Sequence, residues 1–178
     1  LSFQRLITGV YVFDLVWAAL FLLGAVAMRG AGCTWNDITD RDIDASVSRT
    51  ALRPLPSGAV TLKQAYIFLA AQLLIGLLVW LFLPLDAKLV ALLSIPLVGA
   101  YPFMKRVTWW PQAWLGMTFN WGALVGAAVA STISLPVLIL YAGLILWTIA
   151  YDTIYALQDR EDDALIGVRS TARLFGQR

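Results

Sequence analysis

Long apolar runs dominate this sequence and restrict what it can fold into. A helix that spans a lipid bilayer needs about 20 predominantly apolar residues. Five stretches qualify, at roughly 10–35, 64–83, 87–103, 112–131 and 136–158. Hydrophobic residues make up 60% of the chain and charged residues 13%, outside the usual range for soluble domains. The sequence therefore predicts an all-α membrane protein, a transmembrane helix bundle in a single polytopic domain that is truncated at both ends.

The positive charges are distributed unevenly across this predicted bundle. Its long polar connectors at 36–63, 104–111 and 159–178 all fall on one side, and that side carries eleven of the thirteen Lys and Arg residues. By the positive-inside rule this face is cytoplasmic. We therefore expect a multi-pass protein of the inner (cytoplasmic) membrane with its polar site facing the cytoplasm.

Two residue types that commonly carry catalysis are scarce. The chain has no histidine, which excludes histidine-based metal sites and the commonest general base. Its one cysteine, Cys33, cannot form an intrachain disulfide and has no neighbouring base to activate it. The chemistry must therefore come from carboxylates and basic side chains at the membrane surface.

Acidic residues gather at the ends of two apolar runs. The stretch NDITDRDID at 36–44 holds four carboxylates, and QDREDD at 158–163 follows the last apolar run. At about 100° per residue, roughly one quadrant of a continued helix holds Asn36, Asp37, Asp40 and Asp44, with Arg29 on the same face. The second set forms a stripe of Asp152, Tyr155, Asp159 and Asp163, and Asp152 falls below the membrane surface, where a carboxylate is usually functional.

The two acidic segments echo each other. DRDIDASVSRTALR at 40–53 and DREDDALIGVRSTAR at 159–173 share an acidic opening, later arginines and a Thr-Ala pair. Two carboxylate pairs surrounded by arginines suggest magnesium ions that bridge the acids to a diphosphate. A site at the membrane surface further suggests a ligand with a long apolar tail. The competing interpretation, solvated charges that only set topology, does not explain two such pairs on the same side.

At these residues the sequence resembles a known family. The pattern N-D-x-x-D-x-x-x-D, filled by Asn36, Asp37, Asp40 and Asp44, and the later Y-x-x-x-D-x-x-x-D are similar to the two signature motifs of the UbiA-type intramembrane aromatic prenyltransferases. The strings GAGCTWND, RTALRPLPSG, AYPFMKR, YDTIYALQD and STARLFG extend the likeness over almost the whole chain. They are most like the bacterial branch that acts on 4-hydroxybenzoate in ubiquinone synthesis.

The resemblance implies a ring of nine transmembrane helices, of which this chain supplies five, and transfer of a polyprenyl group from polyprenyl diphosphate to an aromatic ring carbon. The fragment alone is then expected to be inactive. Implied partners are the diphosphate donor, 4-hydroxybenzoate or a related acceptor, and the lipid bilayer, with no nucleic acid. The implied magnesium ligands are Asn36, Asp40, Asp44, Asp159 and Asp163.

The resemblance also suggests residues that bind the substrates. Lys105, with the acids of both motifs, would stabilise the departing diphosphate. The further expected contacts are Arg29, Asp37, Arg41, Ser48, Arg53, Tyr101, Arg106 and Tyr155. Among them Arg106 is predicted to grip the acceptor's carboxylate, because a planar guanidinium can form two parallel hydrogen bonds, with Arg41 as the next candidate. Either an aspartate or the diphosphate takes the proton that the ring loses.

Three alternatives stay open. The same chemistry with a haem, chlorophyllide or naphthoate acceptor is the nearest. A CDP-alcohol phosphotransferase also arranges aspartates around metal, but its D-G and A-R pairs are missing here. A cation-coupled transporter or non-catalytic quinone-binding protein belongs to a different class, and a metal-dependent diphosphate-release assay separates it. For Asn120, within the fourth apolar run, lining a cavity and bonding to another helix are both open.

Overall fold

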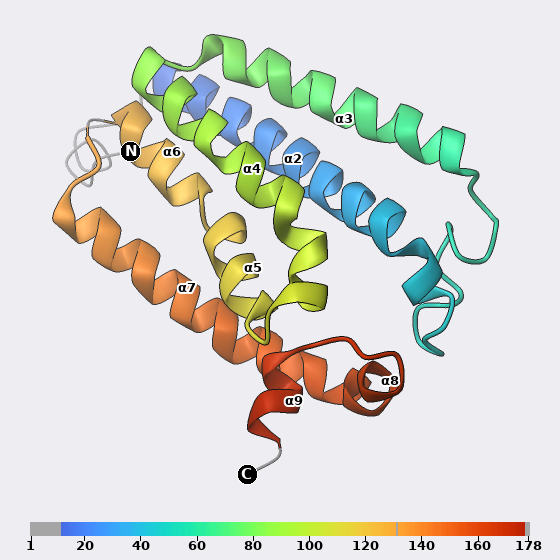
Figure 1. Cartoon of the computed structure of the whole chain (residues 1–178). Coiled ribbons are helices and arrows are strands. Elements are labelled where there is room, and N and C mark those ends of the chain that lie inside the picture. The colour runs from blue at the N-terminus through green and yellow to red at the C-terminus, as the bar shows by residue number, and fades with distance from the viewer. Residues whose placement is uncertain (1–11, 131, 177–178) are drawn as a thin grey trace.

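Helices, joined by turns and loops, are the regular secondary structure of the part that the computed structural model describes, residues 12–130 and 132–176. No strand occurs within these ranges, which confirms the predicted all-α class. Figure 1 shows the elements in chain order. They are α2 (Val12–Asp44), α3 (Leu62–Phe82), α4 (Leu85–Val107), α5 (Pro111–Phe119), α6 (Gly122–Ala130), α7 (Leu135–Ala156), the 3-10 turn η1 (Leu157–Asp159), α8 (Arg160–Leu165) and α9 (Thr171–Phe175).

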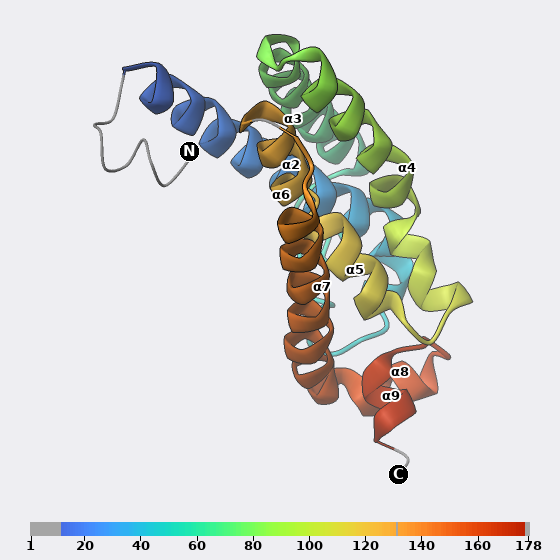
Figure 2. The same cartoon turned by 90° about the vertical axis from the view of Figure 1, so that its left-hand side faces the viewer.

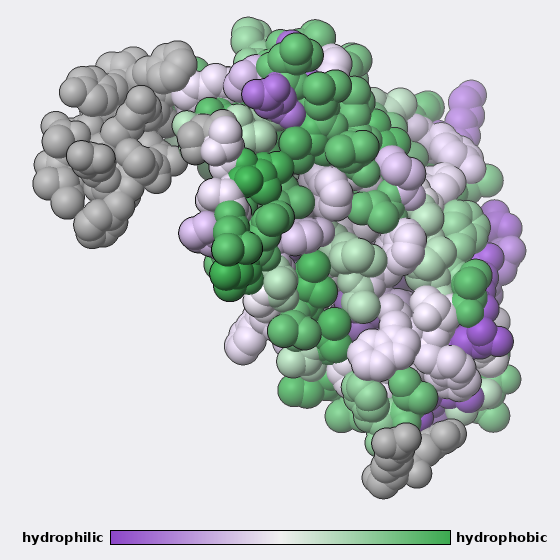
Figure 3. All heavy atoms as spheres, turned by 60° about the vertical axis from the view of Figure 1, so that its left-hand side comes forward, coloured by the Kyte–Doolittle hydropathy of each residue, from purple (hydrophilic) through white to green (hydrophobic). Residues whose placement is uncertain are grey.

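Five segments of the described chain are long and apolar enough to cross a membrane. Large apolar side chains such as Leu22, Phe68 and Trp147 are about 60–70% exposed, at 67%, 59% and 69%. Apolar side chains cover much of the face in Figure 3, and hydrophilic ones lie mainly along one edge. Such exposure would be costly in water and is expected where lipid covers the helices.

The first predicted span continues further than its apolar run. Helix α2 runs without a break through the charged stretch to Asp44, so the first acidic motif is helical over its whole length. Its N-terminal part extends away from the other helices in the view of Figure 2. The polar end of α2 is therefore held on a rigid element, which sets the spacing of its carboxylates.

The fourth predicted span is broken into α5 and α6 near Asn120. The Asn120 amide donates to the carbonyl of Gly116 at 2.9 Å, and across to α7 to the carbonyl of Leu144 at 3.2 Å and the hydroxyl of Thr148 at 2.8 Å. These bonds supply partners at the break, where the regular helical pattern stops. The side chain therefore bonds to another helix.

Small residues allow α5 and α7 to pack closely. A Cβ atom added to Gly116 would lie 3.0 Å from the backbone oxygen of Ile145, so a larger residue has no room there. Close backbone approach at small residues is the usual way in which membrane helices associate. This contact fixes α7, which carries the second acidic motif, against α5.

The polar ends of the helices meet at one end of the bundle. Figure 1 shows the end of α2 with its following loop, the end of α4, and α8 with α9 at the same end. The small apolar core around Leu83, Ala87 and Ala128 lies where α3 passes into α4, against α6. The small apolar core and the polar helix ends thus lie at different levels along the helix axes.

Candidate functional site

The two acidic motifs line a single pocket of about 180 Å³. More than 100 residues separate Asp44 from Asp159 in sequence, yet both side chains reach it. The polar side chains that line the pocket are Asn36 and Asp44 from α2, Arg49, Thr50 and Arg53 from the following loop, Tyr101 and Lys105 from α4, Gln112 from α5, Asp152 from α7, and Asp159, Asp163, Arg169 and Ser170 from the C-terminal part.

The end of the first motif is tied to the loop that follows it. Nη1 of Arg53 lies 2.9 Å from Oδ2 of Asp44 and 3.1 Å from Oδ1 of Asp37, so one guanidinium joins two carboxylates. The Thr50 hydroxyl donates to the backbone oxygen of Asp44 at 2.8 Å, which satisfies a carbonyl at the helix end. Residues 45–60 are therefore folded back over α2.

Asp40 does not lie where its expected role as a magnesium ligand would place it. Its side chain is fully buried, with Nζ of Lys105 2.5 Å from Oδ2 and Nη2 of Arg106 3.2 Å from Oδ1. It does not line the pocket between the motifs, whereas its partner Lys105 does. Asp40 can act as a metal ligand only after Lys105 has moved away from it.

The second motif is held by an arginine of the first loop. Nε and Nη2 of Arg49 donate to the two oxygens of Asp159 at 2.7 and 2.6 Å. Its Nη1 donates to the Tyr155 hydroxyl at 3.2 Å, and the guanidinium lies 5.5 Å from the centre of that ring. Hydrogen bonding to the Asp159 carboxylate raises the pKa of Arg49 above its usual value.

The predicted acidic stripe on the last helix is preserved in part. Helix α7 ends at Ala156, and η1 and α8 continue the chain with a change of pitch. Asp152, Asp159 and Asp163 all line the pocket, but Tyr155 is 56% exposed and reaches the site only through Arg49. Asp163 forms no ion pair within the described ranges, unlike Asp40, Asp44 and Asp159.

The segment after α8 binds the end of α4. The backbone N–H of Arg169 donates to the carbonyl of Lys105 at 2.9 Å, and its Nη1 donates to the carbonyl of Val107 at 2.7 Å. The backbone N–H of Thr171 donates to Oε1 of Gln112 at 3.1 Å. These bonds join the second motif to the helix that carries Lys105.

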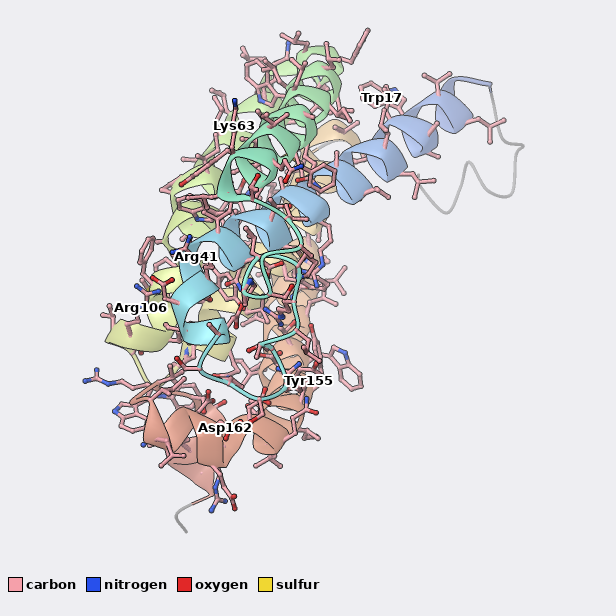
Figure 4. The ribbon with its side chains drawn as sticks, turned by 90° about the vertical axis from the view of Figure 1, so that its right-hand side faces the viewer. Trp17, Arg41, Lys63, Arg106, Tyr155 and Asp162 are labelled. Carbon is pink, nitrogen blue, oxygen red and sulfur yellow. The ribbon has the colours of Figure 1, made fainter. Side chains whose placement is uncertain are left out.

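Several predicted contacts lie outside the pocket. Arg41 pairs with its neighbour Asp42 at 3.0 Å, and Ser48 is exposed on the loop. Arg106 also donates to the Thr39 carbonyl at 3.1 Å and lines a different cavity, of about 460 Å³, with Asp42 and the loop at 166–168. In the view of Figure 4, Arg41 and Arg106 lie on the opposite side from Tyr155.

The position of Arg106 has a simple geometric reason. Consecutive residues on a helix point about 100° apart. Because Lys105 faces the pocket, Arg106 is turned toward the outer flank of α2. The prediction that Arg106 grips the acceptor beside Lys105 therefore loses its structural support.

Arg29 lies deeper in the membrane than any other described cation of α2. Its guanidinium is 4.9 Å from the centre of the Phe119 ring, and it forms no ion pair with an acidic side chain of the described residues. It lies seven residues before Asn36, or about two helical turns. A cation at this depth needs a negative partner.

Two residues that line the pocket, Arg49 and Gln112, are not among the site residues predicted from the sequence. Arg49 was one of several loop arginines, and only its contact with Asp159 distinguishes it. Gln112 is 4% exposed and lines the pocket, and its Oε1 is fixed by a backbone N–H. Its position directly after Pro111 at a helix start carries no signal of this role.

Magnesium fits the donor set of the pocket. No three acidic side chains among residues 12–130 and 132–176 converge into a ready metal cluster. Magnesium, however, typically takes only one or two carboxylates and completes its coordination with phosphate oxygens and water. Hard oxygen ligands line one pocket from two parts of the chain: Asn36 and Asp44 from α2, and Asp159 and Asp163 from the C-terminal part. The arrangement suits an ion shared with a phosphate ligand.

Comparison with known proteins places this geometry in context. The model of the UbiA prenyltransferase family matches residues 6–178. Two similar relatives are named "4-hydroxybenzoate polyprenyltransferase, mitochondrial". The one from Drosophila melanogaster is 54% identical over 92% of this chain and 42% of its own length, and the one from Arabidopsis thaliana is 51% identical over 90% and 40%. This chain thus spans about 40% of each relative.

A solved structure shares the fold. The apo structure of a UbiA homolog from Aeropyrum pernix K1 is 34% identical and superposes with a TM-score of 0.77, over 89% of this chain and 61% of that one. The relatives named above are mitochondrial, so they do not support the bacterial branch that the sequence suggested. The multi-pass membrane architecture is supported by this chain itself, in which five described segments can span a bilayer.

Proposed function

Because this chain belongs to the UbiA prenyltransferase family, we propose that it is part of an enzyme that transfers a polyprenyl group from polyprenyl diphosphate to a ring carbon of 4-hydroxybenzoate. The names of its relatives support this acceptor. Since the chain spans about 42% of such a relative, the complete enzyme would contain further helices that close the membrane cavity. The residues described here would supply both acidic motifs.

The observation that carries this proposal is the charge arrangement of the pocket. Acids of both motifs line it together with four cations, and three of these cations are each bound to a motif carboxylate: Lys105 to Asp40, Arg53 to Asp44 and Arg49 to Asp159. A polyanion that enters with its metal ions can exchange these pairs, because the cations then bind phosphate oxygens and the acids bind metal. The pocket thus already holds cations for the phosphate oxygens and acids for the metal ions.

The magnesium ligands in this proposal are Asn36, Asp44, Asp159 and Asp163. Asp40 would join them once Lys105 has turned to the diphosphate. When bound, magnesium neutralises the negative charge that gathers on the departing diphosphate. The side chains of Lys105, Arg49 and Arg53 would add charge-assisted hydrogen bonds to the same group, which makes cleavage of the allylic carbon–oxygen bond easier.

Arg29 is the cation that we assign to the acceptor's carboxylate. It lies toward the membrane from the diphosphate pocket and has no acidic partner among the described residues. A benzoate carboxylate would supply the missing negative charge. The acceptor ring would then lie between Arg29 and the allylic end of the donor, with Tyr101 beside it.

The membrane orientation follows from the basic connectors. They would remain in the compartment from which the protein is inserted, which is the cytoplasm in a bacterium and the matrix in a mitochondrion. The pocket lies at that end of the bundle and would take both substrates from that side. A prenyl tail would extend from it along the apolar helices into the bilayer.

The test is an assay of the complete protein, purified in detergent or nanodiscs, with a panel of polyprenyl diphosphates and aromatic acceptors. We expect magnesium-dependent product only when donor and 4-hydroxybenzoate are both present. Preference for a naphthoate, haem or chlorophyllide acceptor would replace the acceptor but keep the chemistry. Absence of diphosphate release with every acceptor would leave a binding or transport protein.

A further inference from the structure

The carboxylate of Asp152 lines the same pocket but belongs to neither D-x-x-x-D motif. It lies in α7, seven residues before Asp159, which is about two helical turns toward the membrane. An acidic side chain at that depth is costly to keep and is usually functional. The metal and diphosphate roles proposed at the mouth of the pocket use the acids of the two motifs and the cations bound to them. They give no role to Asp152.

Among the acids that line this pocket, Asp152 and Asp163 are the two without an ion pair to a described residue, and only Asp163 belongs to a motif. Asp40, Asp44 and Asp159 each lie against a lysine or arginine. The Asp152 side chain has no hydrogen bond or ion pair with any residue that the structure describes. The pocket is therefore polarised, with cations at its mouth and an uncompensated carboxylate deeper inside.

Resting on the aromatic prenyl transfer proposed above, we propose that Asp152 is the base that restores the aromatic ring. The donor's carbon–oxygen bond breaks and its electron pair leaves with the diphosphate. A ring π-electron pair, at the carbon next to the one that bears the hydroxyl, forms the new carbon–carbon bond. The hydrogen on that ring carbon then passes as a proton to Asp152, and its bond electrons rebuild the aromatic system.

The other candidate bases are less suited to this step. The diphosphate would lie at the mouth of the pocket, where Lys105, Arg49 and Arg53 neutralise it and lower its basicity. Asp44 and Asp159 are held by arginines in the structure and would hold metal in the working enzyme. Asp163 has no ion pair with a described residue, but as a proposed magnesium ligand it would also be bound to a cation. A carboxylate committed to a cation has little affinity left for a proton. Asp152 is bound to no cation among the described residues.

Tyr101 links Asp152 to the expected place of the acceptor. It lines the pocket together with Asp152. An acceptor whose carboxylate binds Arg29 would lie along this tyrosine. Its ring would then have the allylic cation on the side of the motifs and the Asp152 carboxylate within the same pocket.

The experiment uses the complete protein with Asp152→Asn, which keeps the shape and removes the base. Transfer to 4-hydroxybenzoate should fall by about 100-fold or more, the usual loss of a general base. Ring deuteration of the acceptor beside the hydroxyl should slow the variant but not the wild type. Ionisation of the donor should continue, so a heavy-oxygen label should still scramble from the bridging to the non-bridging positions of the diphosphate.

Controls separate this result from folding defects and from failure of the proposed function. Asp86→Asn removes an exposed carboxylate at the start of α4, outside the pocket, and should behave as wild type. Asp152→Glu keeps a displaced base and should recover part of the transfer, with a smaller isotope effect than Asp152→Asn. If Asp152→Asn does not fold, an isotope effect in Asp152→Glu that the wild type lacks supports the assignment.

Three outcomes would overturn the assignment. Full transfer by Asp152→Asn would show that another group takes the proton. Parallel loss of transfer and of label scrambling would show that Asp152 assists ionisation instead. If Asp152→Asn does not fold, an isotope effect in Asp152→Glu that is no larger than that of the wild type would count against the assignment. If the wild type itself transfers to no aromatic acceptor, the proposed function fails, and the assignment falls with it before any variant is compared.

Discussion

Arg49 and Asp159 are 110 residues apart in sequence and form a two-pronged ion pair, with nitrogen–oxygen distances of 2.7 and 2.6 Å. This pair joins the loop after the first acidic motif to the start of the second. A planar guanidinium that holds both oxygens of one carboxylate fits two phosphate oxygens equally well. Arg49 is therefore placed to change partners when a diphosphate enters the pocket.

Replacing Arg49 should weaken donor binding far more than it weakens the fold. The Arg49 side chain is 38% exposed, and such pairs contribute only about 0–1 kcal/mol to stability. For Arg49→Ala in the complete protein we expect the donor's KM to rise by about tenfold or more, as a lost charge-assisted bond would cause. Arg49→Lys should recover it only partly, because it lacks the fork.

Arg41→Ala is the matched control, since this arginine pairs with its neighbour Asp42 outside the pocket. It removes the same charge from the same end of the bundle. If both variants raise the donor's KM equally, the effect comes from the general surface charge, and the specific role of Arg49 is wrong. Steady-state kinetics at fixed ionic strength make the comparison.

The acids of both motifs should be indispensable to prenyl transfer. We expect Asp40→Ala, Asp44→Ala, Asp159→Ala and Asp163→Ala each to abolish most product formation, as should removal of magnesium with a chelator. The reason is that Asp44, from α2, and Asp159 and Asp163, from the C-terminal part, line one pocket and would share the ions that hold one diphosphate. Asp40 would join them once Lys105 has turned to the diphosphate. Product analysis by chromatography measures this, and full activity in Asp159→Ala combined with Asp163→Ala would refute two-sided binding.

Helical periodicity made the motif positions predictable. Asp40 and Asp44 fall one turn apart because α2 continues to Asp44, and the same reasoning places Asp159 and Asp163 on adjacent turns. Apolar runs of sufficient length likewise gave the five membrane segments. Local spacing and hydrophobicity suffice for such features, since neither depends on distant residues.

Contacts between distant segments were beyond the reach of the sequence. The partners of Arg49 and Gln112 depend on how the loop at 45–60 and the segment after α8 fold back onto the bundle. The break near Asn120 depends on acceptors in α7. Arg106 was assigned by its charge type, but the orientation of Lys105 on the same helix decides which way it faces.

Lys105 should stabilise the protein by neutralising Asp40. The carboxylate is fully buried, and its Oδ2 lies 2.5 Å from Nζ of Lys105. Removing one partner of a buried pair typically costs about 3–5 kcal/mol, because the other charge is left behind. Lys105→Met should therefore lower the denaturation midpoint, with a loss reduced by the remaining contact with Arg106.

The double variant separates charge from packing. Asp40→Asn removes the uncompensated charge, so Lys105→Met together with Asp40→Asn should be more stable than Lys105→Met alone. Denaturant unfolding in one detergent gives the coupling free energy of the pair. Strictly additive losses would mean that the two side chains do not interact in solution.

For the acceptor's carboxylate, the sequence favours Arg106 and the structure favours Arg29. Arg106 is bound by Asp40 and the Thr39 carbonyl and lines a different cavity, whereas Arg29 has no acidic partner among the described residues. We therefore expect Arg29→Ala to raise the KM for 4-hydroxybenzoate by about 30- to 100-fold, the effect of losing roughly 2–3 kcal/mol of charge-assisted binding. The donor's KM should change little.

Arg106→Ala serves as the comparison, because it removes the cation that the sequence favoured. It should leave the acceptor's KM near the wild-type value and lower stability slightly through Asp40. Arg29→Lys should restore acceptor binding only in part, since a point charge lacks the two parallel bonds of a guanidinium. A large rise in the acceptor's KM for Arg106→Ala with none for Arg29→Ala would return the carboxylate to Arg106, and would require the end of α4 to turn when the substrates bind.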